Sequence, residues 1–147
     1  MTLTRKQQGF TIVELLIVII VIGILATLVL VTFSGIQQSA RNTQRVTDIK
    51  AVASHLETYN AKEGEYPTQT EMNTETFITD LKGLDKESTK DPNGDSYSFI
   101  DDATSNQYGY LPSPAACDNT ADNLCTGFAL TWKEEGGDGN TNTVNNL

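Results

Sequence analysis

Gly9-Phe10-Thr11-Ile12-Val13-Glu14 leads directly into an almost unbroken apolar run over residues 15–31. With its flanking apolar residues the run reaches about 20 residues, the length of a membrane-spanning helix. Apolar side chains would lie on every side of that helix, so it is not an amphipathic surface helix. A charge at the centre of such a helix costs about 2.5–3.5 kcal/mol on insertion scales. We therefore expect Glu14 to have a functional partner.

The chain has three parts that differ in polarity and charge. The 147 residues carry a formal net charge of −9. Residues 1–9 are polar and basic, residues 10–34 apolar, and residues 35–147 polar and acidic. Without residues 1–9, which include two of the ten basic residues, the charge is 8 − 19 = −11. This balance predicts one domain with an appendage and no general nucleic-acid binding.

Three alternatives account for the apolar segment. A secretory signal peptide would be cut after the apolar core, but this core exceeds the usual 7–15 residues. An uncut signal anchor leaves Glu14 unexplained. The third alternative is cleavage before the segment, between Gly9 and Phe10. Arg5 and Lys6 precede the segment and Arg41 and Arg45 follow it, so positive charge favours an N-in, C-out topology only weakly.

The motif Gly9-Phe10-Thr11-x-x-Glu14 with its apolar run resembles the N-terminus of type IV pilins and type II secretion pseudopilins. The resemblance implies that residues 1–9 are a leader, removed by a prepilin peptidase that cuts after Gly9 and N-methylates Phe10. It also implies that Glu14 pairs with the Phe10 amine of its own or a neighbouring subunit during assembly. The alternative is that the Glu14 side chain reaches the lipid headgroups.

A second helical pattern follows the apolar segment. Its apolar residues recur at helical spacing and form one stripe: Ile49, Val52, Ala53, Leu56 and Tyr59. Gly64 is a suitable helix stop. The sequence thus predicts one helix over residues 10–62, with a membrane or filament-core part at 10–34 and an amphipathic stem at 35–63. His55, the single histidine, is predicted to be an ordinary helix residue.

Residues 64–135 predict a small globular head. A short helix is expected around 73–81, ended by Gly83, and strands at 97–100, 108–111 and 127–132. In the last strand, Phe128, Leu130 and Trp132 share one face, which is expected to pack on the stem stripe. Residues 136–147, rich in Gly and Asn, are expected to form a flexible tail. The fold class is therefore α+β, a long N-terminal helix packed on a small antiparallel sheet.

The segment Asp91-Pro92-Asn93-Gly94-Asp95-Ser96-Tyr97 allows two interpretations. It resembles the Asp-Pro-x-Gly-x-x-Tyr stretch of major pseudopilins, which implies a calcium site with Asp91, Asn93 and Asp95 as ligands. With Asp102 these residues occupy positions 1, 3, 5 and 12 of a calcium loop, but Ser96 stands where that loop needs glycine. The alternative is a tight Asn-Gly turn between strands.

Cys117 and Cys125 are the two cysteines, and both follow the apolar segment. In an exported chain they favour a disulfide. The alternative is two free thiols. The sequence contains no nucleophile elbow, Walker loop or zinc pair, so we expect no enzymatic activity.

The resemblance implies a structural subunit that forms a helical homopolymer. Its implied partners are the membrane, a prepilin peptidase, a polytopic platform protein and a cytoplasmic assembly ATPase. Our first expectation is a type IV pilus subunit, a precursor in the cytoplasmic membrane that ends in an extracellular pilus. The alternative is a major pseudopilin of type II secretion, favoured by Tyr66-Pro67 and Asp91-Pro92-x-Gly94. A hypothesis from another class is a membrane-anchored or secreted, calcium-dependent binding module.

Overall fold

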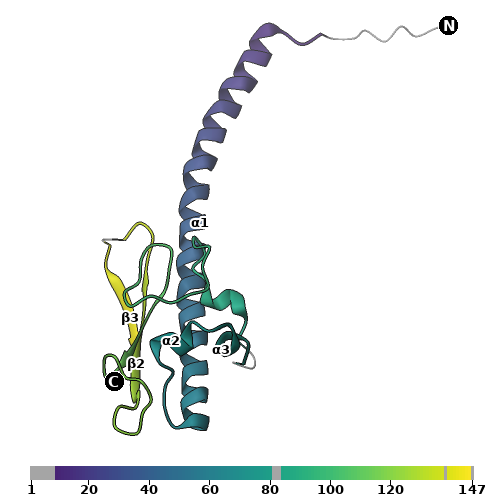
Figure 1. The fold of residues 1–147 in the computed structure, drawn as a ribbon. Coiled ribbons are helices and arrows are strands. Elements are labelled where there is room, and N and C mark those ends of the chain that lie inside the picture. Colours follow the sequence, from purple (N-terminus) through teal and green to yellow (C-terminus); the bar gives the residue numbers. More distant parts are fainter. Residues whose placement is uncertain (1–8, 81–83, 138, 147) are drawn as a thin grey trace, which may run out of the picture. The chain divides into compact units, whose positions relative to one another are not determined.

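The computed structural model describes residues 9–80, 84–137 and 139–146. The chain forms two compact units, residues 1–37 and residues 38–147. The helix α1, Ile12–Glu63, begins in the first unit and ends in the second (Figure 1). It ends where predicted, because Gly64 has a φ of 84°, a backbone conformation that side chains disfavour.

In the first unit, α1 is long and apolar enough to cross a membrane, judged by length and composition. Its apolar side chains are exposed in the isolated chain; Leu28, for example, is 63% exposed. The two threonine hydroxyls in this stretch donate to helix carbonyls, Thr27 to Ile24 (2.8 Å) and Thr32 to Leu28 (2.9 Å). These internal hydrogen bonds satisfy the polar groups in an apolar surrounding.

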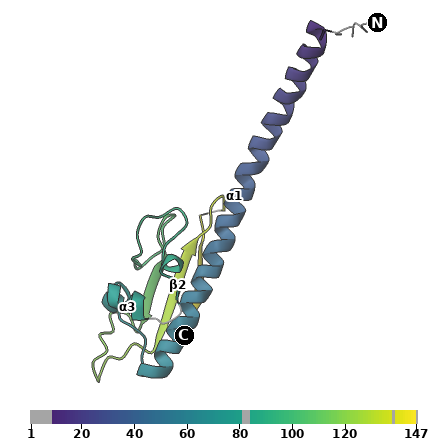
Figure 2. The ribbon, with the colours of Figure 1, turned by 90° about the vertical axis from the view of Figure 1, so that its right-hand side faces the viewer.

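The second unit contains a three-stranded antiparallel sheet in the order β1-β2-β3. The strands are β1, Gly109–Ser113, β2, Gly127–Lys133, and β3, Thr141–Asn145. Tyr110 pairs with Leu130, which pairs with Val144 on its other side. The sheet lies beside the C-terminal part of α1, which belongs to the same unit (Figures 1 and 2).

One apolar core joins the stem to the sheet. Ile49, Val52 and Leu56 of α1 are fully buried, and Ala53 and Tyr59 pack at the edge. This confirms the predicted stripe. The predicted face of β2 is also confirmed, because its alternate residues are buried. The buried cluster consists of Ile49, Val52, Leu56, Tyr66, Met72, Phe77, Phe99, Tyr108, Tyr110, Cys117, Cys125, Phe128, Leu130 and Trp132.

Short helices connect the stem to the sheet. They are α2, Gln69–Met72, α3, Glu75–Asp80, and the 3₁₀ helix η1, Lys86–Thr89. Thr68 and Glu71 form a capping box at the start of α2. The helix predicted around 73–81 corresponds to α3, whereas its predicted end at Leu81 and Gly83 lies outside the described residues.

The strand predicted at 97–100 is wrong. Only Ile100 makes a bridge, parallel to Gly109. Side chains take the place of a neighbouring strand at Phe99: its N–H donates to Asn73 Oδ1 (2.7 Å), and its carbonyl accepts from Asn73 Nδ2 (3.0 Å) and from Gln69 Nε2 (3.2 Å). The buried Phe99 ring therefore enters the core from an extended loop.

The flexible tail predicted at 136–147 is also wrong, because it contains β3. Thr141, Thr143 and Val144 are β-branched residues, which suit a strand. The pairing continues past β3, where the Asn146 N–H donates to the Phe128 carbonyl (3.1 Å). The Val144 side chain is partly buried against the edge of the core. This apolar contact was not predicted, because the segment is mostly polar.

Candidate processing and assembly site

The predicted cleavage point lies immediately before α1. Gly9 and Phe10 are exposed and outside the helix, and Phe10 is 86% exposed. Among the described residues, no atom beyond Gly9 and its chain neighbours lies within 4 Å of where a Gly9 side chain would begin. The described part of the chain therefore leaves the bond between these residues exposed. Residues 1–8 of the predicted leader lie outside the described residues, and cleavage stays a prediction.

Glu14 has a partner inside its own chain. Its Oε2 atom accepts from the Thr11 N–H (2.9 Å) and the Thr11 hydroxyl (2.7 Å), while the Glu14 N–H donates to Thr11 Oγ1 (3.2 Å). This reciprocal pattern is a capping box, with Thr11 as N-cap and Glu14 three residues later. Sequence reasoning missed it, although the spacing Thr11-x-x-Glu14 is its signature.

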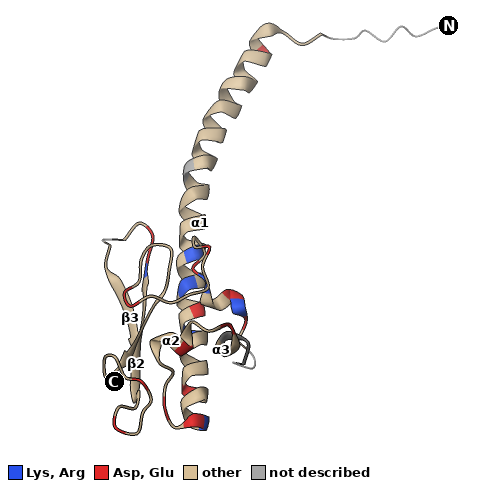
Figure 3. Cartoon of the chain, in the orientation of Figure 1, with Lys and Arg blue, Asp and Glu red and all other residues tan. Residues whose placement is uncertain are grey.

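The capping box accounts for one function of Glu14 and leaves another open. It satisfies donors at the start of α1 that would otherwise have no partner. The predicted pairing of Glu14 with the Phe10 amine concerns a cleaved chain, and here Phe10 is still bonded to Gly9. That pairing stays a prediction. Figure 3 shows a long stretch of α1 without charged residues between this acidic first turn and the first arginine.

A network of ion pairs anchors the start of the stem within the second unit. Arg45, which is fully buried, donates from Nε and Nη2 to Asp91 (2.7 and 2.9 Å). Its Nη1 lies 2.9 Å from Glu135 Oε1, and Arg41 makes two further hydrogen bonds to Glu135 (2.7 and 2.5 Å). The bonds from Arg41 hold the pKa of Glu135 down at about 2. Two cations and two carboxylates thus neutralise one another.

Asp48 lies beside this network with different chemistry. The Tyr108 hydroxyl donates to its Oδ2 atom (3.1 Å), and both residues are buried. Burial raises the pKa of Asp48 above its usual range. Burial, with the nearby Asp48 and Asp91 charges, also raises the pKa of Tyr108. Asp48 and Tyr108 therefore form a buried hydrogen bond between α1 and the residue just before β1.

The three calcium ligands predicted from the sequence are Asp91, Asn93 and Asp95, and each has a defined environment in the structure. Asp91 is buried against Arg45, Asn93 donates from Nδ2 to Glu135 (2.7 Å), and Asp95 is exposed. An incoming cation would compete with the guanidinium of Arg45 for Asp91. No three His, Cys, Asp or Glu side chains gather as a metal site within the described ranges. Calcium binding stays a prediction, testable by melting with calcium and with chelator.

The segment 91–94 forms a tight turn, but not the Asn-Gly turn between strands that the alternative predicted. The Gly94 N–H donates to the Asp91 carbonyl (2.8 Å), so Pro92 and Asn93 are the central residues. The Asn93 N–H donates to Asp91 Oδ1 (2.8 Å), which is a typical turn contact of aspartate. No strand flanks this turn on either side within the described residues.

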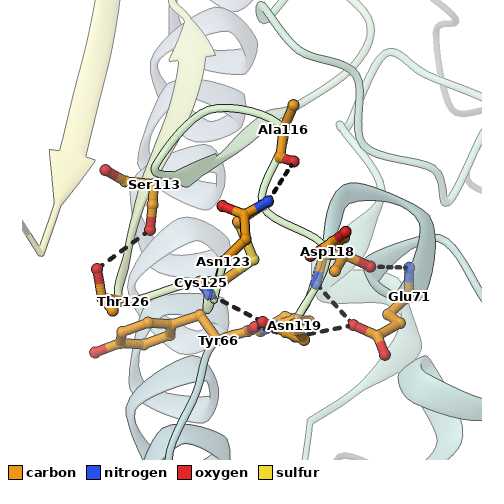
Figure 4. Close-up of a disulfide and its surroundings, with 12 residues drawn as sticks. Tyr66, Glu71, Ser113, Ala116, Asp118, Asn119, Asn123, Cys125 and Thr126 are labelled. Atoms are coloured by element: carbon orange, nitrogen blue, oxygen red, sulfur yellow. Dashed lines mark hydrogen bonds between the residues drawn. A yellow bond between two sulfur atoms is a disulfide. The ribbon is translucent and has the colours of Figure 1, made fainter. Parts of the chain in front are cut away.

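The disulfide between Cys117 and Cys125 is present, with its Cα atoms 5.3 Å apart (Figure 4). Both cysteines belong to the core. His55 is half-buried on α1, and its prediction as an ordinary helix residue stays untested.

Comparisons with known proteins agree with the N-terminal motif and extend into the head. Residues 4–30 match the family model described as the prokaryotic N-terminal methylation motif. The type II secretion system core protein G of Vibrio cholerae is 33% identical over 106 residues, 65% of this chain and 72% of the relative. The protein of that name from Escherichia coli K12 is 27% identical over 146 residues, 92% of this chain and 100% of the relative. The one from Pseudomonas aeruginosa is 31% identical over 107 residues, 73% and 75% of the two chains. No solved structure matches the chain.

Proposed function

Because the chain belongs to the family of type II secretion system core protein G, a type IV pilin-like family, we propose that it is the main structural subunit of a type II secretion pseudopilus. The names of the relatives favour the pseudopilin, our alternative from the sequence, over the surface pilus subunit that we expected first. The observation that carries the proposal is the register of Gly9, Phe10 and Glu14 with an exposed apolar helix.

The physical argument starts from the apolar surface of residues 12–36. Nearly every large apolar side chain there is about half exposed or more in the isolated chain. Burying apolar area is worth about 25 cal/mol per Å², so this surface needs lipid or other copies of the helix around it. Lipid covers this apolar surface while the subunit is in the membrane, and the helices of neighbouring subunits cover it after assembly.

Processing prepares the chain for that packing. Cleavage after Gly9 removes Arg5 and Lys6 and leaves a free amine on Phe10. A cationic amine at the first residue can pair with a Glu14 carboxylate on the same or the neighbouring subunit. An unpaired Glu14 in an apolar filament core would be strongly disfavoured, so this pairing would set the axial register.

The proposal assigns the chain a structural function and no catalytic one. Its partners are further copies of itself, the membrane, a prepilin peptidase, a platform protein and an assembly ATPase. It resides in the cytoplasmic membrane with the head on the outer side, and the pseudopilus extends from there into the periplasm.

The first experiment separates the cell envelope from material sheared off the cells and sequences the N-terminal peptide by mass spectrometry. We expect a peptide that begins at methylated Phe10, in the envelope fraction. A Gly9→Leu variant, which replaces the residue at the proposed cut, should keep its leader and serve as the unprocessed reference. The processed form in the sheared fraction would instead support a surface pilus. A native chain that keeps residues 1–9, or starts near Gly35, would overturn the filament proposal.

A second readout addresses secretion itself. In cells that lack this chain, exported enzymes should accumulate in the periplasm and disappear from the medium. The native chain should restore their release, and Gly9→Leu should not. Normal release without the chain would assign it to another filament.

A further inference from the structure

The guanidinium of Arg45 contacts four oxygen atoms from three segments of the chain. Its Nε and Nη2 atoms donate to the two carboxylate oxygens of Asp91, at 2.7 and 2.9 Å. Its Nη1 atom lies 2.8 Å from Asn42 Oδ1 and 2.9 Å from Glu135 Oε1. Carboxylate and amide oxygens are also the ligands that calcium takes in proteins. The guanidinium thus has the kind of surroundings that a bound calcium ion has.

The charges of this cluster balance without a metal ion. Asp91 and Glu135 supply two negative charges, and Arg41 and Arg45 supply two positive ones. The side chains of Arg45 and Asp91 are only 0% and 1% exposed. A divalent ion at Asp91 would add two positive charges beside a buried guanidinium, and like charges repel strongly where water is excluded. Calcium could therefore bind Asp91 only in place of Arg45.

Both carboxylate oxygens of Asp91 already have donors. Oδ2 accepts from Arg45 Nε, and Oδ1 accepts from Arg45 Nη2 and from the Asn93 N–H (2.8 Å). Calcium needs about six to eight oxygen ligands, at about 2.3–2.6 Å. Asn93 and Asp95, the other predicted ligands, are exposed, and Asn93 turns its Nδ2 donor toward Glu135. The turn 91–94 is therefore arranged around the guanidinium and does not gather oxygen atoms for another cation.

The guanidinium joins the stem to two loops. Asp91 begins the turn after η1, and Glu135 lies between β2 and β3. The second loop stays close to the stem at Gly136, where φ is 69° and where a Cβ atom would clash with the Gln38 amide. A structural metal ion stabilises a fold in the same way, by joining ligands that are far apart in the chain. Arg45 does so with a charge that belongs to the chain.

We propose that Arg45 is a built-in cation that replaces a divalent metal ion in the head, so that the head folds and stays folded without calcium. The calcium site predicted from the sequence and this guanidinium exclude each other at Asp91. When the guanidinium is removed, the oxygen atoms of Asp91, Glu135 and Asn42 become a calcium site. Neither statement rests on the filament function proposed above, because both concern the folded head alone.

The test compares the processed full-length protein in detergent with two single variants. Arg45→Met keeps a long unbranched side chain and removes the charge, and Lys50→Met removes an exposed charge from the same stem. Each protein is melted in about 10 mM calcium chloride, which exceeds the dissociation constants of weak extracellular calcium sites, about 10⁻⁴–10⁻³ M. The other two solutions contain potassium chloride of equal ionic strength or a chelator. Unfolding is followed by Trp132 fluorescence.

We expect the melting temperatures of the native chain and of Lys50→Met to be the same in all three solutions. Arg45→Met should melt at a lower temperature than the native chain, because Asp91 is then a buried charge without its partner. Calcium should raise the melting temperature of Arg45→Met by about 5 °C, since an ion that binds only the folded state stabilises it. Adding Asp91→Asn to Arg45→Met should abolish this rise.

Two results would overturn the proposal. One is a native chain that melts higher with calcium or lower with chelator, and the other is a folded Arg45→Met chain that does not respond to calcium. If Arg45→Met does not unfold cooperatively in any solution, Arg45→Lys decides, because lysine keeps the positive charge. Cooperative unfolding of Arg45→Lys that calcium leaves unchanged would support the built-in cation. Failure of Arg45→Lys to fold without calcium would contradict it.

Discussion

At the scale of single residues, Glu14 combines two properties that one substitution can separate. Its side chain caps α1 through Thr11, which requires an acceptor oxygen at the third helical position. The proposed pairing with the Phe10 amine requires a negative charge. Glutamine supplies the acceptor without the charge, and alanine supplies neither.

We predict that Glu14→Gln and Glu14→Ala both insert and are both cut after Gly9, but that both enter the pseudopilus at least tenfold less than the native chain. The reason is that neither variant has a carboxylate for the Phe10 amine. Quantitative immunoblotting of crosslinked filaments measures the loss, and Thr11→Ser, which keeps the cap, is the control. If Glu14→Gln assembled normally and Glu14→Ala did not, capping alone would explain this residue.

At the scale of elements, periodic patterns predicted the structure where burial is regular. The stem stripe and the alternating face of β2 were predicted because one side of each element is apolar. β3 was missed because Val144 is its single large apolar residue. Its strand conformation therefore depends on pairing with β2 and not on a pattern in its own sequence. The strand at 97–100 was predicted wrongly because the side chain of Asn73, distant in sequence, replaces a strand partner. Local patterns contain none of these long-range contacts.

The loop after η1 provides a prediction at this scale. A Cβ atom on Gly94 would lie 2.1 Å from the Asn106 carbonyl oxygen, a backbone atom that cannot move independently. Gly94→Ala should therefore lower stability by about 1–3 kcal/mol, the usual cost of overpacking. Gly137→Ala is the matched control, because its nearest neighbour lies at 3.9 Å and its φ is not in the left-handed region. Thermal unfolding of the two variants is followed by Trp132 fluorescence. Equal melting temperatures would show that the backbone around Gly94 moves enough to accommodate the added methyl group.

At the scale of the whole molecule, one ion-pair network joins segments that are far apart in the chain. Arg45 and Asp91 are separated by 46 residues, and Arg41 and Glu135 by 94. Asn42 adds a reciprocal pair of hydrogen bonds with the Glu135 backbone (3.2 and 3.0 Å). In the sequence alone, Arg41 and Arg45 indicate only the topology and Asp91 only a calcium ligand, because charge pairing over such separations depends on the fold.

This network predicts how stability changes with acidity. Glu135 has a folded pKa of about 2, below its usual value of 4.5. The folded state thus binds fewer protons there than the unfolded state at intermediate pH. The resulting stabilisation is complete above about pH 4.5 and is lost as the pH falls toward 2. Asp48 acts in the opposite direction, because burial raises its pKa and protonation relieves that cost.

We predict that Glu135→Gln flattens the acid part of the stability curve of the processed full-length protein in detergent. At pH 7 the variant should melt below the native chain, by about 5–10 °C, because Arg41 loses its partner. At pH 3 the difference should shrink, since protonation has by then removed much of the native advantage. Glu134→Gln, at the exposed neighbouring carboxylate, is the control and should follow the native curve. Melting temperatures of Glu135→Gln that stay parallel to the native values from pH 7 to pH 3 would show that Glu135 does not couple folding to protons. The acid sensitivity of the head would then have to come from other carboxylates.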